Sequence, residues 1–269
     1  MEPEQSLSNE PFQLLLFTID PAVIKKACCV GIHGFIVDME WRGKKERQAN
    51  YDTQVNINTL NDLRRVRANT DLKVICRING FGPATGQEVE DVIAAGADEI
   101  FLPMVRHPDE VRRTLDMIRG RCDLAILVET MDAVRCAETL GSLPLKRVYV
   151  GLNDLAIDRG LRNIFESVVD GTVDRIRSHF RVPFGFGGVT LPDFGSPIPA
   201  RLLIAEMARL NCRFSFLRRS FFRDIDGKDW EVEVPRILQA CDAARHRPLA
   251  EMEEQRNEFI SSVRDMVQG

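Results

Sequence analysis

The fold is decided by two similar stretches of sequence, Leu-Ala-Ile-Leu-Val-Glu-Thr (124–130) and Val-Tyr-Val-Gly-Leu-Asn-Asp (148–154). Each is a run of apolar residues that ends in a carboxylate, Glu129 or Asp154, and this pattern predicts two buried strands. The spacing leaves room for one helix between them, so we expect parallel strands that bring both acids to the same edge of a sheet. Two carboxylates at one edge indicate a metal site. The alternative is that each acid caps the helix that follows it.

Apolar runs and helical patterns alternate along the rest of the chain. Strands are expected at residues 12–17, 34–39, 72–78, 99–105, 124–130, 148–153, 182–185 and 213–217. Helices are expected at 22–30, 59–68, 87–95, 109–119, 133–140, 165–179, 199–210 and 230–245. Eight strands alternating with helices predict an α/β protein with a closed (β/α)8 TIM barrel. A doubly wound sheet usually has fewer strands and an early glycine-rich phosphate loop, which this sequence lacks.

The chain is expected to hold one barrel domain, residues 12–248, between two short additions. Residues 1–11 form a polar leader without the basic and apolar segments of a secretory signal. Residues 249–269 form one amphipathic helix more than a barrel needs. Its apolar positions are Met252, Phe259, Val263 and Met266. We expect this helix to pack on a neighbouring subunit of a homo-oligomer; the alternative is that it folds back across the amino end of the barrel.

Composition excludes several classes of protein. The 269 residues are 44% hydrophobic, which fits a globular protein, and no apolar run approaches the length of a membrane span. A net charge of −4 gives no general attraction to nucleic acid or to an anionic membrane. The seven cysteines include no C-x-x-C pair and lie mostly among apolar residues, which indicates reduced thiols. We therefore expect a cytoplasmic protein with a small-molecule ligand.

In such a barrel the chemistry lies at the carboxyl ends of the strands. The residues expected at that edge are Asp38, Glu40, Trp41, Arg77, Asn79, Pro103, Met104, Glu129, Asn153, Asp154, Gly187, Gly188, Arg218 and Arg219. We predict that Glu129 and Asp154 bind Mg²⁺ or Mn²⁺, because such an ion takes few protein carboxylates and completes its coordination with water and substrate. Arg77 stands in an apolar strand and needs an anion. It either holds a substrate oxyanion beside the metal or forms a buried salt bridge to Asp38 or Glu40.

Other catalytic schemes find less support in the sequence. A Schiff-base lysine should project from the carboxyl end of a strand, but Lys73 and Lys146 stand at amino ends. No Ser-His-Asp or Cys-His set is plausible. The turn at residues 185–188 either cradles a phosphate or serves only as a tight turn. Arg218 and Arg219 either bind a second acidic group or form a surface pair.

Five short motifs at these strand ends, in order along the chain, resemble the aldolase and citrate-lyase-like (HpcH/HpaI) metal-dependent barrels. They are Val-Asp-Met-Glu (37–40), Arg-Ile-Asn (77–79), Ile-Phe-Leu-Pro-Met-Val (100–105), Leu-Val-Glu-Thr (127–130) and Gly-Leu-Asn-Asp-Leu (151–155). The resemblance implies that Glu129 and Asp154 are the metal ligands and that Arg77 contacts a substrate oxygen. It implies that Asp38 and Glu40 are an acid pair supporting this site. It also implies that backbone N–H groups of Asn153 and Asp154 hold the carboxylate of pyruvate.

The resemblance implies formation or cleavage of carbon–carbon bonds through a metal-held enolate of pyruvate, oxaloacetate or an acyl-CoA, commonly in homo-oligomers. Trp41 stands where the hydroxy-acid aldolases carry a histidine, and Leu127 where they often carry a glutamine. We therefore expect Trp41 to form an apolar wall against the substrate and Glu40 to orient or relay a proton. The expected function is a divalent-metal-dependent lyase or aldolase, or a condensing enzyme in reverse, acting on a 2-oxo acid. The alternatives are a citryl- or malyl-CoA-type thioester lyase or thioesterase, and a non-catalytic ligand-binding barrel.

Overall fold

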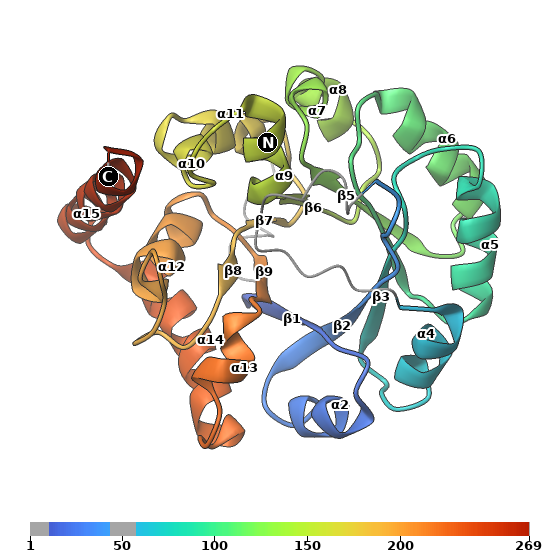
Figure 1. The fold of residues 1–269 in the computed structure, drawn as a ribbon, viewed down its shortest axis with the longest axis horizontal. Helices are drawn as coiled ribbons and strands as arrows, with labels where there is room; N and C mark the ends of the chain where they lie inside the picture. The colour runs from blue at the N-terminus through green and yellow to red at the C-terminus, as the bar shows by residue number, and fades with distance from the viewer. Residues whose placement is uncertain (1–10, 44–57, 269) are drawn as a thin grey trace.

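The computed structural model describes residues 11–43 and 58–268. Its strands form one parallel sheet in the order β7-β6-β5-β4-β3-β2-β1-β9-β8, with helices around the outside (Figure 1). The strands are β1 (Gln13–Phe17), β2 (Ile32–Asp38), β3 (Lys73–Arg77), β4 (Glu99–Leu102), β5 (Asp123–Val128), β6 (Arg147–Val150), β7 (Phe184–Phe186), β8 (Gly188–Val189) and β9 (Phe214–Leu217). The prediction of a TIM-type α/β barrel is confirmed.

The seventh strand of the barrel is divided in two at Gly187. This residue has a φ of 59°, a left-handed conformation that glycine adopts without strain. On one side of it β7 pairs with β6, and on the other side β8 pairs with β9. The break therefore lets one short segment join two neighbours and close the ring.

The helices follow the strands, with several departures from the expected pattern. They are α2 (Pro21–Ala27), α4 (Leu60–Arg67), α5 (Thr85–Ala94), α6 (Pro108–Ile118), α7 (Met131–Arg135), α8 (Ala137–Gly141), α9 (Leu152–Arg159), α10 (Glu166–Val169), α11 (Thr172–Ser178), α12 (Ala200–Arg209), α13 (Ser220–Asp224), α14 (Trp230–His246) and α15 (Leu249–Gln268). The single helices expected at 133–140 and 165–179 are each divided in two. The second division falls at Gly171, whose φ is 80°. Helices α9 and α13 were not predicted.

Side chains of alternating strand positions fill two separate cores, because successive residues of a strand point to opposite faces. The inner core fills the barrel and consists of Leu15, Ile36, Ile75, Phe101, Ala125, Leu127, Tyr149, Phe214 and Phe216. The outer core lies between the strands and the helices. Each large apolar side chain buried in this way contributes roughly 1.5–3 kcal/mol. The inner core also forms a solid floor beneath the carboxyl ends of the strands.

Two strands end three residues earlier than expected, and both corrections shape the site. β6 stops at Val150 rather than at residue 153, and α9 begins at Leu152. Asn153 and Asp154 therefore lie in the first turn of a helix rather than at the end of a strand. β4 stops at Leu102 rather than at residue 105, and Met104 beyond it has a positive φ of 54°. In both places a glycine or a left-handed residue turns the chain out of the strand.

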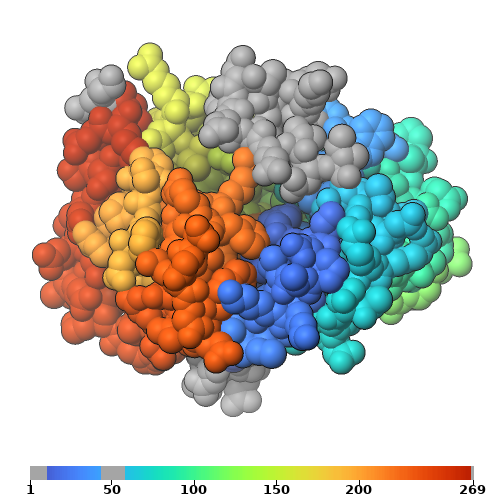
Figure 2. Space-filling view, turned by 60° about the horizontal axis from the view of Figure 1, so that its bottom comes forward, coloured from blue at the N-terminus to red at the C-terminus, as the bar shows by residue number. Residues whose placement is uncertain are grey.

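Helix α15 packs on α12 and α10 of its own barrel (Figures 1 and 2). Phe259 has no exposed surface, and its ring meets Phe165 edge-on at a centroid distance of 6.0 Å. Arg256 Nη1 donates to Glu206 Oε2 at 2.6 Å. The apolar stripe is therefore covered within the chain, and neither a neighbouring subunit nor the amino end of the barrel is needed to bury it. Assembly into a homo-oligomer stays a prediction. No helix among the described residues is long and apolar enough to span a membrane.

Candidate active site

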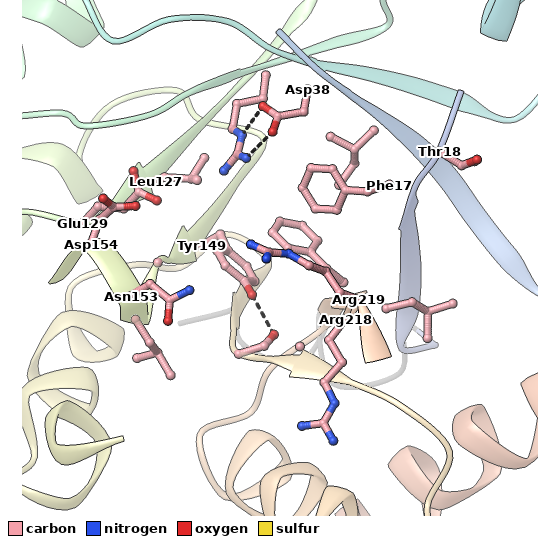
Figure 3. Close-up of a pocket in the computed structure, with 18 of the residues that line it drawn as sticks. Phe17, Thr18, Asp38, Leu127, Glu129, Tyr149, Asn153, Asp154, Arg218 and Arg219 are labelled. Carbon is pink, nitrogen blue, oxygen red and sulfur yellow. Dashed lines mark hydrogen bonds and ion pairs between the residues drawn. The ribbon is translucent and has the colours of Figure 1, made fainter. Parts of the chain in front are cut away.

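The carboxyl ends of the strands open into a cavity of about 900 Å³ (Figure 3). Its floor includes the inner-core residues Ile36, Leu127, Tyr149 and Phe216. The charged residues that line it are Asp20, Asp38, Arg77, Glu129, Asp154, Arg218 and Arg219. The structure thus brings most of the site residues predicted from the sequence to one cavity, at the edge of the barrel where chemistry was expected.

Glu129 and Asp154 lie next to each other at one side of the cavity (Figure 3). Glu129 directly follows β5, and Asp154 is the third residue of α9; both are buried. The residue that caps α7 is Thr130, whose side chain accepts from the backbone N–H of Ala133. The N-cap of α9 is Gly151. Neither carboxylate is the N-cap of the helix that follows it, so the helix-cap alternative is wrong, and the metal site stays a prediction.

The carboxylate of Glu129 is held in a narrow cradle. Its Oε2 accepts from the backbone N–H of Met104 at 3.1 Å. A Cβ placed on Gly151 would lie only 2.2 Å from Oε1, so glycine is required where β6 passes this carboxylate. Burial raises the pKa of Glu129 to about 8, and the neighbouring carboxylates of Asp154 and Glu40 also raise it. Glu129, Asp154 and Glu40 therefore lie close enough for the charge of each to act on the others.

Arg77 ends β3, opposite Asp38 at the end of β2, and both line the cavity. Its Nε and Nη2 donate to the two carboxylate oxygens of Asp38 at 2.8 and 2.7 Å, and Glu40 Oε2 lies 3.5 Å from Nε. Burial alone would lower the pKa of Arg77, but Asp38, Glu40 and Glu129 raise it, so the guanidinium stays charged. Within the described residues Nη1 donates to no acceptor. Arg77 can therefore keep its salt bridge and also contact a substrate, because Asp38 fixes one edge of the guanidinium and Nη1 is available for the second contact.

The loop after β2 is tied to the end of β3 by Asn79. Its Oδ1 accepts from the backbone N–H groups of Trp41 and Arg42 at 3.0 and 2.9 Å. The Trp41 side chain is 54% exposed and is not among the residues that line the cavity. Glu40 is buried beside Arg77 and does not line the cavity either. The structure does not bring these two predicted site residues to the cavity.

The donor set at Glu129 and Asp154 fits a hard divalent cation. Within residues 11–43 and 58–268, no group of three or more His, Cys, Asp or Glu side chains is arranged to hold a metal ion. A cation here would have two protein carboxylates, which suits Mg²⁺, since this ion keeps several waters and binds few protein groups. Its positive charge would offset the charge of the neighbouring carboxylates, which helps to raise the pKa of Glu129. None of the four histidines lines the cavity.

The first turn of α9 supplies backbone donors at the same place. Leu152, Asn153 and Asp154 line the cavity, and no side chain caps this helix. The first N–H groups of a helix have no partner within the helix, so they suit an anion such as a carboxylate. Sequence reasoning did not single out Gly151 for its role beside Glu129, or the backbone N–H of Met104. In the sequence, the only signal for Gly151 and Met104 was that each stands in one of the five short motifs.

Comparison with known proteins gives a consistent result. The sequence pattern of the HpcH/HpaI aldolase/citrate lyase family matches residues 13–168. No curated protein matches the sequence. The fold is similar to an HpcH/HpaI aldolase from Desulfitobacterium hafniense DCB-2, at 13% identity and a TM-score of 0.62, over 93% of this chain and 98% of that one.

Two further solved structures share the fold at low identity. The first is the citrate synthase SbnG, at 16% identity and a TM-score of 0.58, over 83% of this chain and 94% of that one. The second is RipC from Yersinia pestis, at 14% identity and a TM-score of 0.57, over 90% of this chain and 98% of that one.

Proposed function

Because the chain belongs to the HpcH/HpaI aldolase/citrate lyase family and is thereby a carbon–carbon lyase, we propose that it acts on the enolate of a 2-oxo acid with a divalent cation. Pyruvate and oxaloacetate are the simplest such acids. Bond cleavage releases the 2-oxo acid as its enolate, and the reverse reaction attaches the enolate carbon to an acceptor. The observation that carries this proposal is the pair of adjacent buried carboxylates, Glu129 and Asp154, in one cavity with a fixed arginine.

Each group around the cavity has a separate part in this proposal. Glu129 and Asp154 would hold Mg²⁺ or Mn²⁺, and a cation there would supply positive charge beside the substrate oxygens. Arg77 Nη1 donates to the oxygen on which negative charge develops as the enolate forms. The N–H groups at the start of α9 hold the substrate carboxylate. These donors are oriented before the substrate binds, so they need little reorganisation during the reaction.

Asp38 and Glu40 act on the substrate only through Arg77. Asp38 fixes the plane of the guanidinium through two hydrogen bonds, and Glu40 adds negative charge behind it. Removal of Asp38 would therefore misdirect Arg77 and lower turnover without direct loss of a substrate contact. Both acids are positioning residues in this proposal.

The test is proton exchange at the methyl group of pyruvate. We expect the protein to exchange these protons for deuterium in D₂O with Mg²⁺ or Mn²⁺, and to stop when a chelator removes the metal. Proton NMR follows the loss of the methyl signal directly. The matched variant is Asp123→Ala, which removes an exposed acid at the opposite end of the barrel and should keep the exchange. A protein that binds metal but exchanges no protons would favour the non-catalytic barrel.

A further inference from the structure

The C-terminal helix α15 lies behind one wall of the cavity. Ile164 and Phe165, which connect α9 to α10, line the cavity, and so does Leu203 of α12. α15 packs on both α10 and α12 from the outside of the barrel (Figure 1). Among its described residues, none lines the cavity. The helix can therefore influence a ligand only through the wall that it supports.

The apolar contact between α15 and this wall passes through two aromatic rings. Phe259 of α15 has no exposed surface, and its ring meets the ring of Phe165 at an interplanar angle of 87°. Edge-on aromatic pairs contribute more than the area that they bury. Because Phe165 also lines the cavity, it joins the ligand space to α15.

Two polar ties hold the wall on either side of Phe165. Before it, Asn163 Nδ2 donates to Met266 Sδ of α15 at 3.6 Å, and Asn163 Oδ1 accepts from the backbone N–H of Phe165 at 2.9 Å. After it, Arg256 Nη2 donates to the carbonyl of Val168 in α10 at 3.2 Å. α15 therefore fixes the wall through three separate contacts.

The wall has little regular structure of its own. α10 comprises only four residues, and the segment that contains it runs between two left-handed glycines, Gly160 and Gly171. So short a helix closes few internal hydrogen bonds, and its position depends on packing against its neighbours. The strands β5 and β6 are instead paired on both sides within the sheet. The position of the wall therefore depends on α15, whereas the strand ends are held by the sheet.

We propose that Phe259 is a positioning residue, which holds the cavity wall at Ile164 and Phe165 in place for the substrate without touching the substrate itself. The inference rests on the proposed function, because a 2-oxo acid must occupy the cavity to contact this wall. α10 also packs on α9, whose first turn is proposed to bind the substrate carboxylate. Displacement of the wall weakens the ground state and the transition state alike, because Glu129 and Arg77 keep their places. The KM then rises while kcat is unchanged.

The test measures both constants for the exchange of pyruvate methyl protons with Mg²⁺ present. Phe259→Ala leaves space behind Phe165, and we expect the KM to rise roughly four- to tenfold, equivalent to the loss of one or two buried methylene contacts. Phe259→Leu keeps a large apolar side chain and should recover much of the wild-type KM. Arg256→Gln removes the tie to α10 without opening the core, so it tests the same wall if Phe259→Ala does not fold. It should also raise the KM.

Two controls separate positioning from stability. Phe180→Ala removes a ring that is only 1% exposed, between α11 and β7 and outside the cavity lining. Partial unfolding lowers the apparent kcat but not the KM, because only folded molecules bind pyruvate, so Phe180→Ala should keep the wild-type KM. Glu258→Gln removes the exposed ion pair between α15 and Arg201 of α12 and should change neither constant. An unchanged KM in folded Phe259→Ala protein, or an equal rise in Phe180→Ala, would overturn the proposal.

Hydrogen exchange of backbone amides, followed by mass spectrometry, gives a readout that needs no substrate. Phe259→Ala should speed exchange at residues 160–170 several-fold, while the amides of β5 and β6 keep their wild-type rates. If pyruvate exchanges no methyl protons with the wild type, the proposed function fails, but faster exchange confined to this segment still supports the positioning role of Phe259. Unchanged exchange at residues 160–170 in folded Phe259→Ala protein would overturn that role.

Discussion

The two ends of the barrel each bury an arginine beside a carboxylate, yet they differ in charge balance. At the amino end Arg147 Nε lies 2.8 Å from Glu99 Oε1, and Arg147 Nη1 donates to Gln13 Oε1 at 2.9 Å. Here one buried acid faces one buried arginine. At the carboxyl end Arg77 pairs with Asp38, and further buried acids lie around it.

The difference teaches how to separate a structural ion pair from a ligand site in one fold. In a pair of one acid and one arginine the formal charges balance, and the pair contributes to the shape of the molecule. A group of several neighbouring acids has a cost that a cationic ligand can offset. A buried arginine beside a carboxylate therefore has different consequences at the two ends of the barrel. Substitutions at matched positions should show this difference.

The largest expected effect is the loss of metal binding. Glu129→Ala or Asp154→Ala removes one of two carboxylates, so we expect Mg²⁺ affinity to fall on the order of a hundredfold or more and metal-dependent exchange to vanish. Calorimetric titration with Mg²⁺ measures this. Asp123→Ala at the amino end should leave the affinity unchanged. Normal Mg²⁺ affinity in both Glu129→Ala and Asp154→Ala would refute the metal site.

The second effect concerns the two arginines. Arg77→Lys should lower turnover on the order of a hundredfold, because lysine lacks the planar fork that bonds to Asp38 and still presents another donor. Arg147→Lys should lower stability and leave turnover per folded molecule intact. Pyruvate exchange rates, corrected for the folded fraction by circular dichroism, compare the two variants. Similar turnover in Arg77→Lys and Arg147→Lys would mean that Arg77 has a purely structural role.

The third effect is on stability. Glu99→Gln leaves Arg147 buried without its anion and should lower the free energy of unfolding by about 3 kcal/mol. Glu129→Gln in metal-free protein imitates the protonated carboxyl that the raised pKa favours and should not destabilise the fold. Urea denaturation of both variants and the wild type gives the comparison. An equal loss in the two variants would mean that charge balance does not distinguish the ends.

The last effect is a pH dependence that Glu129 contributes at the carboxyl end. Glu129 has a folded-state pKa of about 8, raised mainly by burial from a usual value of 4.5. Between these values the folded state holds a proton that the unfolded state has lost. Stability of the metal-free protein should therefore fall as pH rises, by up to roughly 1.4 kcal/mol per pH unit. Urea titrations from pH 5 to 8 should show this slope, and Glu129→Gln or added Mg²⁺ should reduce it.

Much of the fold and part of the site follow from the sequence alone. Strand and helix periodicity, together with acids at the ends of apolar runs, predicted the barrel and placed Glu129, Asp154 and Arg77 at one cavity. Periodicity shows that a helix face is buried but not what covers it, so it did not reveal that α15 packs on α12 and α10. Periodicity also cannot show where a strand ends. Because β6 ends earlier than expected, Asp154 lies in α9 and not at the end of a strand.

Other features depend on contacts between distant segments. The steric need for Gly151 appears only when β5 and β6 lie side by side. The exposure of Trp41 follows from the hydrogen bonds between its loop and Asn79. Arg218 Nη2 has no hydrogen-bond partner within the described residues, and Asp224 accepts from Thr190, Ser220 and Arg223 instead. None of these contacts has a signature in local sequence.

The pairing of β1 with β9 has a consequence for the order in which the protein folds. Gln13 lies opposite Phe214, so the ring closes only when nearly the whole barrel sequence has been synthesised. Bringing together segments so far apart in sequence is slow, because the intervening chain loses entropy. Glu129 and Asp154 belong to adjacent segments near the middle, whereas Arg218 extends from the strand that completes the ring. During synthesis the part of the site with Glu129 and Asp154 can therefore form first, and the wall of the cavity at Arg218 forms only with the last strand.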